Sequence, residues 1–330
     1  MNRRLLFSGL FGSAGLAACA PLSQRPLIPP QDFTGPRLEP DALISFDGHR
    51  LPMSVWPSQT GAPSAVVVAL HGMNDYAEAF TLAGPFWAAR GVTTYAYDQR
   101  GFGRGAGRGV WGGEGLMDAD LNAACALVRA RHPAATLAVV GESMGGAVAV
   151  TAFASARPPD ADRLVLLSPA VWGWSDQSIP ETLALWLSAH LAPASKLEPP
   201  SWLTRKIRAT DNIDALRKMS RDRNMIFGTR IDAIYGLVGL MQDAQDEIGR
   251  VSVPLLYQYG AHDQIIPARA AHHAVKKLGP NARTAFYTDD YHLLNRDLGR
   301  DRVLADALAF IRDPTAPLPS GAPHVPHAAR

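Results

Sequence analysis

The sequence predicts an α/β fold, with a mostly parallel sheet flanked by helices and one helical insertion. Short apolar runs alternate with helix-length segments over residues 41–313. Strands joined by helices pair in parallel through right-handed crossovers. In addition, the apolar run 136–140 leads into Gly141-Glu142-Ser143-Met144-Gly145-Gly146, and small apolar residues follow it. A strand, a sharp glycine-containing turn and a helix in this order are typical of the same fold class.

The predicted strands follow from local signals. Asp47-Gly48 separates the runs 42–46 and 50–56, which is the signal of a β-hairpin. The Val-rich run 64–70 predicts a strand that is buried on both faces. The same reasoning predicts further strands at residues 92–97, 136–140, 163–167, 254–259 and 283–288.

The helices of the main domain are marked by the residues that end them. A helix predicted over 76–90 is closed by Gly91, and one over 118–131 ends before Pro133. A last helix is predicted over 301–312.

One interval, 171–250, breaks the alternation because no buried strand is evident in it. It holds the strongly apolar segment 179–192 with Trp186, the charged segment 205–223 and the mixed segment 231–244. These patterns predict a helical cap over the edge of the sheet. Two interpretations of the apolar segment stay open: it forms the core of the cap, or it is a membrane-binding surface.

The overall composition predicts a globular domain. The chain has 330 residues, of which 47% are hydrophobic and 19% are charged, which is enough material for a sizeable core. The formal net charge is +2, and no basic run with interleaved aromatic residues occurs. This argues against a nucleic-acid partner.

The N-terminus predicts a targeting segment. Asn2-Arg3-Arg4 is basic, and residues 5–18 are apolar but too few to span a bilayer. The ending Leu16-Ala17-Ala18-Cys19 resembles the lipobox of bacterial lipoproteins. The resemblance implies a signal peptide over 1–18, a lipid on Cys19, and a place in the bacterial cell envelope on the extracytoplasmic face of a membrane. A plain secretory peptide, cleaved at another small residue, is the alternative.

Two segments outside the main domain are rich in proline. Residues 19–40 predict an extended tether between the lipid and the fold, and residues 314–330 predict a disordered tail. His324 and His327 in that tail are possible metal ligands, although a solvated tail is the favoured interpretation. If Cys19 is lipidated, Cys125 has no disulfide partner and is predicted to be a buried, inert thiol.

Three residues form a candidate catalytic triad. Ser143 lies in a G-x-S-x-G turn, which lifts a serine hydroxyl clear of its neighbours. Such a serine needs a base to take its proton and an acid to orient the base. Asp263 follows the strand 254–259, and His292 follows the strand 283–288. All three would lie at the carboxyl ends of parallel strands, where α/β sheets place their active sites.

The chain resembles the α/β-hydrolase group of monoacylglycerol lipases, lysophospholipases and related serine aminopeptidase-type hydrolases. The resemblance covers residues 42–312. It rests on Leu70-His71-Gly72-Met73, Tyr97-Asp98-Gln99-Arg100-Gly101-Phe102-Gly103, Gly141-Glu142-Ser143-Met144-Gly145-Gly146, Gly260-Ala261-His262-Asp263 and His292-Leu293-Leu294-Asn295. It implies an α/β-hydrolase fold with a helical cap after the sixth strand. It also implies the nucleophile Ser143, the acid Asp263 and the base His292, with neither a metal nor an organic cofactor.

Two backbone N–H groups are predicted to form the oxyanion hole. Met144 follows the nucleophile directly, at the start of a helix, where a free N–H is available. The resemblance implies that the second donor is Met73, the residue after His-Gly. The two methionine side chains would then flank the scissile carbonyl and favour acyl substrates.

The chain departs from the family pattern at three places. Glu142 stands where these lipases often have histidine, Met73-Asn74-Asp75 replaces a more usual Gly-Glu-His-like sequence, and Arg104-Gly105 replaces a common serine. None of these changes removes a catalytic group.

Other residues compete for the catalytic roles. His262 is the rival base, and Asp289 or Asp290 is the rival acid. The remaining interpretations are structural, with His71 placing the Met73 loop, Asp98 and Arg100 bracing the next turn, and His272 and His273 on the surface.

Three functions are compatible with these features. The first is a membrane-tethered carboxylic ester hydrolase for a monoacylglycerol, a lysophospholipid or another single-acyl ester. The second is a peptidase or amidase, in which Glu142, Asp176 or Asp243 binds a peptide N-terminus. The third is a non-catalytic envelope protein, because a fold does not determine a function.

Overall fold

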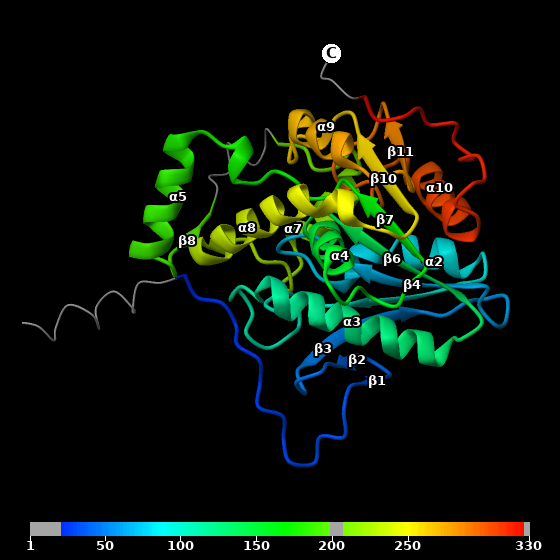
Figure 1. Cartoon of the computed structure of the whole chain (residues 1–330), viewed down its shortest axis with the longest axis horizontal. Coiled ribbons are helices and arrows are strands. Elements are labelled where there is room, and N and C mark those ends of the chain that lie inside the picture. The colour runs from blue at the N-terminus through cyan, green and yellow to red at the C-terminus, as the bar shows by residue number, and fades with distance from the viewer. Residues whose placement is uncertain (1–20, 199–206, 327–330) are drawn as a thin grey trace, which may run out of the picture.

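The computed structural model describes residues 21–198 and 207–326, which fold around one large sheet (Figure 1). The strand order is β1-β2-β3-β5-β4-β6-β7-β10-β11. The bounds are β1 Arg37–Glu39, β2 Ala42–Ile44, β3 Arg50–Trp56, β4 Ala65–Leu70, β5 Val92–Tyr97, β6 Thr136–Glu142, β7 Arg163–Leu167, β10 Leu255–Gly260 and β11 Ala282–Tyr287.

The sheet is mostly parallel, as predicted. Strand β4 pairs in parallel with β5 and β6, and the parallel pairing continues through β7, β10 and β11. The predicted hairpin forms the antiparallel end, where β2 pairs with β3 and Ala42 lies opposite Pro52. All carboxyl ends from β5 to β11 therefore meet at one edge.

Helices cover both faces of the sheet. One face carries α3 (Glu114–Arg131), α4 (Met144–Ala154), α8 (Ile231–Glu247) and α9 (Ala268–Lys277), and the other carries α2 (Ala83–Ala88) and α10 (Arg300–Arg312) (Figure 1). Successive residues of β4 alternate between the two cores: Val66 and Val68 join the first, and Val67 joins the second. This period of two explains why the central strands are apolar throughout.

The interval between β7 and β10 is mainly helical. It contains η2 (Trp174–Asp176), α5 (Ile179–Leu191), α7 (Ile213–Ser220), α8 and η3 (Ile248–Arg250), with a small two-stranded sheet of β8 (Lys196–Leu197) and β9 (Thr229–Arg230). Helix α5 begins with a capping box, in which Ser178 and Glu181 satisfy each other's backbone N–H groups. Within the described ranges, no helix has the length and apolar character needed to cross a bilayer.

The predicted continuous helix over 76–90 is wrong. The segment forms a short 3₁₀ helix η1 (Ala77–Phe80), a break, and then α2. Pro85 lacks an N–H, so a helix running through it would lose a backbone hydrogen bond. Gly84 also lies so close to the Trp56 ring that a Cβ there would overlap the ring.

The proline-rich tail is ordered as far as residue 326, so the prediction of disorder is wrong for residues 314–326. Phe286 in β11 donates its N–H to the Pro323 carbonyl (2.8 Å), and Val325 donates to Thr284 Oγ1 (3.0 Å). The Val325 side chain is buried in the core. Residues 327–330, with His327, lie outside the described ranges.

The predicted tether also lies against the domain. Ser23 forms a β-bridge with Trp111, and the Leu27 N–H donates to Asp47 (2.9 Å). Strand β1 then joins the sheet. Cys19 and the predicted signal peptide lie outside the described residues.

Candidate active site

Ser143 lies in a strained turn between β6 and α4. Its backbone has φ +51° and ψ −116°, a region that residues other than glycine rarely adopt. A Cβ at Gly145 would overlap the Leu70 carbonyl, and one at Gly141 would lie 2.5 Å from the Gly145 oxygen. Glycine is therefore required at both positions, and the predicted elbow has a steric basis.

Asp263 and His292 are in hydrogen-bond contact. His292 Nδ1 lies 2.7 Å from Asp263 Oδ2, and both side chains are almost completely buried. The other carboxylate oxygen, Oδ1, accepts the N–H groups of Ile265 (2.8 Å) and Ile266 (2.9 Å). These bonds hold the acid in one orientation, so it can fix the tautomer of the imidazole.

The pKa of His292 is raised above its ordinary value. Burial is the largest single influence and opposes the positive charge. The charge and hydrogen bond of Asp263, together with the charges of Glu142 and Asp297, outweigh it. The imidazole is thereby a stronger base than burial alone would leave it.

The sheet brings these residues to one edge. Ser143 follows β6, Asp263 follows β10 and His292 follows β11, and the order β6-β7-β10-β11 makes these strands near neighbours. Glu142, adjacent to Ser143 in the chain, is close enough for its charge to act on His292. The arrangement matches the order Ser, Asp, His that the sequence predicts.

Two backbone segments beside Ser143 offer N–H donors. Met144 is the first residue of α4, where the N–H has no acceptor within the helix and the helix dipole favours negative charge. Met73 lies in a turn closed by the Asp75 N–H and the Gly72 carbonyl (3.3 Å). A Cβ at Gly72 would lie 3.3 Å from Ser143 Cβ, so this turn passes directly against the serine.

The prediction that both methionine side chains flank a substrate carbonyl is wrong for Met144. Its side chain is fully buried in the core, whereas Met73 is only partly buried and packs against that core. At Met144, only the backbone can face a substrate.

His71 has a structural role at the start of the Met73 turn. Its Nδ1 donates to the Gly72 carbonyl (2.8 Å), while its Nε2 accepts the Gln99 N–H (2.9 Å). Burial lowers the pKa of His71, so it stays neutral and keeps both bonds.

Asp98 and Arg100 brace neighbouring turns. Asp98 accepts the Ala77 N–H (3.0 Å) and pairs with Arg104 (2.9 Å). The buried Arg100 pairs with Asp47 and Asp120, at 2.7 and 2.6 Å.

The rival acid and base residues have other roles. His262 is exposed and its ring lies 5.3 Å from the Tyr291 ring. Asp289 and Asp290 pair with Arg302, at 3.4 and 3.0 Å. They hold the loop before His292, and the carboxylate that contacts His292 is that of Asp263.

Two further predictions concern residues away from this edge. His272 is buried in α9, so its assignment to the surface is wrong, while His273 is partly exposed. Cys125 is a buried free thiol whose pKa is raised by burial. Among the described residues, no cluster of His, Cys, Asp and Glu has the arrangement of a metal site.

Sequence reasoning missed Arg296, which is 4% exposed. It forms an ion pair with Asp75 and lies 3.3 Å from Glu142 Oε2. It lies four residues after His292, but its carboxylate partners are 221 and 154 residues away in the chain, so the sequence held no local signal for its role.

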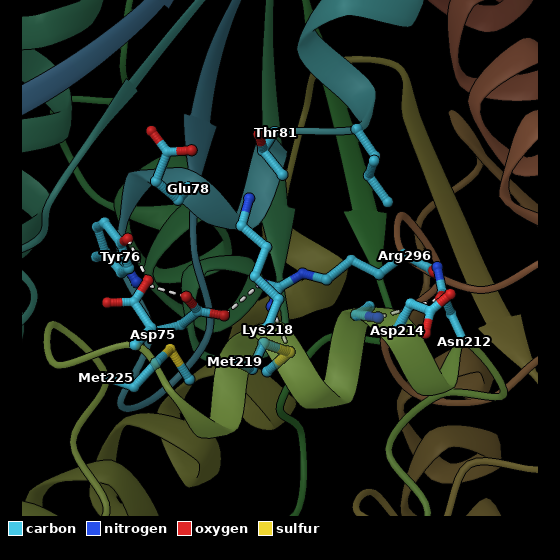
Figure 2. Close-up of a pocket in the computed structure, with 13 residues that line it drawn as sticks. Asp75, Tyr76, Glu78, Thr81, Asn212, Asp214, Lys218, Met219, Met225 and Arg296 are labelled. Carbon is cyan, nitrogen blue, oxygen red and sulfur yellow. Dashed lines mark hydrogen bonds and ion pairs between the residues drawn. The ribbon is translucent and has the colours of Figure 1, made fainter.

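A cavity of about 250 Å³ lies between η1 and α7, next to this ion pair (Figure 2). Its lining is mostly apolar and includes Tyr76, Leu82 and Met219, while Asp75 and Arg296 form part of one wall. Ser143, Asp263 and His292 are not among its lining residues. The cavity thus contacts the charged groups behind the candidate active site and not the reacting groups themselves.

Comparison with known proteins places this geometry in a family. Residues 61–299 match the family described as serine aminopeptidase, S33. The chain is 26% identical over 287 residues to a monoacylglycerol lipase of Mycolicibacterium smegmatis, covering 82% of this chain and 95% of that protein. It is 23% identical over 265 residues to the monoglyceride lipase of Rattus norvegicus, covering 78% and 84%.

Solved structures share the fold. The monoacylglycerol lipase of Paleococcus ferrophilus superposes with a TM-score of 0.62 at 18% identity, covering 79% of this chain and 98% of that one. A soluble variant of monoglyceride lipase from Saccharomyces cerevisiae, in complex with a substrate analog, gives 0.66 at 17% identity, covering 88% and 100%. Because the family match spans most of the chain, the protein belongs to the serine aminopeptidase S33 family and is a serine hydrolase with the α/β-hydrolase fold.

Proposed function

We propose that the protein is a carboxylic ester hydrolase of the monoacylglycerol lipase type, acting through Ser143, His292 and Asp263. The observation that carries this proposal is the 2.7 Å contact between Asp263 and His292 at the sheet edge where the strained Ser143 lies. The similarity to proteins named monoacylglycerol lipase supports the choice of substrate class.

The mechanism follows from these positions. Ser143 Oγ attacks the ester carbonyl carbon while His292 Nε2 takes the hydroxyl proton. The carbonyl oxygen becomes an oxyanion that accepts hydrogen bonds from the Met73 and Met144 N–H groups. His292 then protonates the leaving alcohol, the C–O bond breaks, and an acyl-enzyme remains. Water, deprotonated by His292, releases the carboxylic acid and restores Ser143.

The surroundings of the Met73 turn support an acyl substrate. Met73 lines a small hollow together with three apolar side chains, namely Phe102, Trp111 and Ile226. An acyl chain would gain about 0.8 kcal/mol for each CH₂ group that it buries among such side chains. We therefore propose a single-acyl ester, such as a monoacylglycerol or a lysophospholipid, as the substrate.

Two of the three carboxylates that could bind a peptide N-terminus are engaged by other side chains. Glu142 is fully buried beside Arg296. Asp176 accepts from Gln245 Nε2 at 2.5 Å. Asp243 is exposed on α8, next to the carboxylate of Glu114. These contacts favour the esterase over the peptidase.

Substrate preference tests the proposal. Monoacylglycerols, lysophospholipids and simple acyl esters should be cleaved with much higher kcat/KM than aminoacyl amides, because Glu142 and Asp176 already bind other side chains and cannot pair with an ammonium group. Ester hydrolysis is measured by titration of the released acid. Amide hydrolysis is measured by release of the chromophore from chromogenic amides. A clear preference for the amides would overturn the ester assignment and favour the peptidase.

We further propose that Cys19 carries a lipid and holds the enzyme at a membrane of the bacterial cell envelope. Helix α5 supports this because its apolar residues are spaced four apart along one exposed face. They are Ile179 (83% exposed), Leu183 (53%), Leu187 (41%) and Leu191 (73%). The described chain begins on the same side: Ser23 bridges Trp111, which packs on Gly236 of α8, and α8 contacts α5 (Figure 1).

Vesicle binding tests the role of α5 separately from the lipid. A chain without the signal segment, with Cys19→Ser, should still bind phosphatidylglycerol vesicles in a flotation assay. Leu183→Glu combined with Leu187→Glu should lower that binding at least about tenfold, because two leucines no longer enter the lipid. Ala126→Glu combined with Ala130→Glu, at two exposed positions on α3, is the charge-matched control. Binding that the double variant leaves unchanged would exclude α5 as the membrane surface.

A further inference from the structure

The Arg296 guanidinium contacts several segments of the candidate active site. Its Nη2 pairs with Asp75 and lies 3.3 Å from Glu142 Oε2. Its Nε donates to the Ala79 carbonyl (3.3 Å), and its Nη1 contacts Met219 Sδ (3.1 Å). Figure 2 shows the Arg296 side chain extending along the cavity wall toward Asp75.

Three segments that carry a proposed catalytic group meet at this guanidinium. Asp75 closes the turn that presents the Met73 N–H, since its own N–H donates to Gly72. Glu142 immediately precedes Ser143. Arg296 itself lies in the turn that follows His292, closed by its N–H donating to Leu293 (2.8 Å). One side chain thus connects the oxyanion donor, the nucleophile and the base.

Stability alone is a poor explanation for this arrangement. Buried ion pairs can often be replaced by apolar residues of similar size without loss of stability, because desolvation offsets the attraction between the charges. The network is also incompletely satisfied, since Glu142 Oε1 is buried and has no hydrogen-bond partner among the described residues. A guanidinium, however, can hold two carboxylates in fixed directions, which an apolar side chain cannot do.

We propose that Arg296 is a positioning residue, which holds the Met73 turn and the Ser143 elbow in register with His292. The inference rests on the proposed function, because it assumes that these three segments carry the reaction. Its effect is geometric: the oxyanion donors and Ser143 Oγ must reach the same carbonyl group, and small errors in such placement are costly.

Three variants separate positioning from charge balance. Arg296→Met leaves Asp75 and Glu142 as buried, unpaired carboxylates, so this single variant should be less stable than wild type. The triple variant Asp75→Asn, Glu142→Gln, Arg296→Met removes all three charges of this cluster and keeps side chains of similar shape. We expect the folded triple variant to lose about 10²-fold in kcat with KM changed less than about threefold. Arg296→Lys should recover part of the loss, because it restores the charge without the planar fork.

Arg100 provides a matched control. It is equally buried and pairs with two carboxylates, Asp47 and Asp120, but these lie on segments without a proposed catalytic group. The corresponding triple variant, Asp47→Asn, Asp120→Asn, Arg100→Met, should keep kcat within about threefold of wild type when folded, because no reacting group moves. A folded Arg296 triple variant with wild-type kcat would overturn the proposal.

A second readout does not depend on the ester substrate. The rate at which a fluorophosphonate labels Ser143 should fall in parallel with kcat in the Arg296 variants, because labelling needs the same nucleophile and oxyanion donors. If wild type is labelled but cleaves none of the esters, the proposed substrate fails while this rate still tests Arg296. An unchanged labelling rate in the folded triple variant counts against positioning.

The pH profile of Glu142→Gln supplies a third readout. The charges around His292 come from Asp263 after β10, Glu142 at the end of β6, and Asp297 and Arg296 on its own loop. Because the Glu142 charge raises the pKa of His292, its removal should shift the acid limb of kcat/KM to lower pH. The Arg100 triple variant should show no such shift. If the acid limb of kcat/KM stayed at the wild-type pH in Glu142→Gln, the proposed connection between the Ser143 elbow and His292 would be contradicted.

Discussion

Replacing Ser143 with alanine should lower kcat for ester hydrolysis by about 10⁴-fold or more, which leaves only binding and the oxyanion hole to act on the substrate. Alanine cannot form the acyl-enzyme, and no other hydroxyl lies in the elbow. The effect is measured with purified protein on the best ester of the panel, at saturating substrate. Circular dichroism and thermal melting should show a folded protein, because alanine keeps the Cβ of serine and the backbone at φ +51° is equally strained in both.

Fluorophosphonate labelling provides the control for this experiment. Intact-mass measurement should show one phosphonyl group on wild type and none on Ser143→Ala. Folded wild-type protein without any label would favour the non-catalytic envelope protein. Turnover that persists in Ser143→Ala would show that another residue is the nucleophile.

Replacing Asp263 with asparagine should lower kcat/KM by about 10⁴-fold through the orientation of the imidazole. The asparagine oxygen can still accept the Ile265 and Ile266 N–H groups, so its NH₂ group would face His292. His292 Nδ1 must then accept a hydrogen bond, which places the ring proton on Nε2, where the base needs a lone pair.

The pH dependence of Asp263→Asn distinguishes this cause from simple misfolding. Activity rises with pH as the His292 imidazolium loses its proton. In wild type, Asp263 raises the pKa of His292. Without the carboxylate the pKa falls, so the acid limb of the residual kcat/KM should move to lower pH. Asp290→Asn is the matched control, because Asp290 pairs with Arg302 (3.0 Å) and not with the base. If Asp290→Asn lost as much activity as Asp263→Asn, the assignment of the acid would be wrong.

Much of the site could be predicted because its signals are local. The elbow needs glycines within two residues of Ser143, and these are visible in the sequence. Asp263 and His292 each follow an apolar run, and parallel strands place their carboxyl ends together whatever lies between them. The central strands were predictable for the same reason, since burial on both faces makes them continuously apolar.

The features that were missed depend on contacts between distant parts of the chain. Arg296 meets Asp75 across 221 residues and Glu142 across 154 residues. No local pattern distinguishes such an arginine from a solvated one. The proline-rich tail has a composition typical of disorder, but β11 provides N–H and hydroxyl partners that composition does not reveal. The sequence around His272 suggests a surface position. The residue is buried because α9 packs its apolar face on the sheet.

The ordered tail has a consequence for how neighbouring molecules meet. Strand β11 is at one end of the sheet, where free N–H groups could recruit a strand from another copy. The segment 314–326 occupies that side, and its prolines offer no N–H groups in return. At the opposite end, the short β1 carries Arg37 and Glu39, which pair with each other at 2.8 Å. Both ends of the sheet therefore disfavour the addition of a strand from a second copy, so crowding of the protein should not lead to edge-to-edge aggregation.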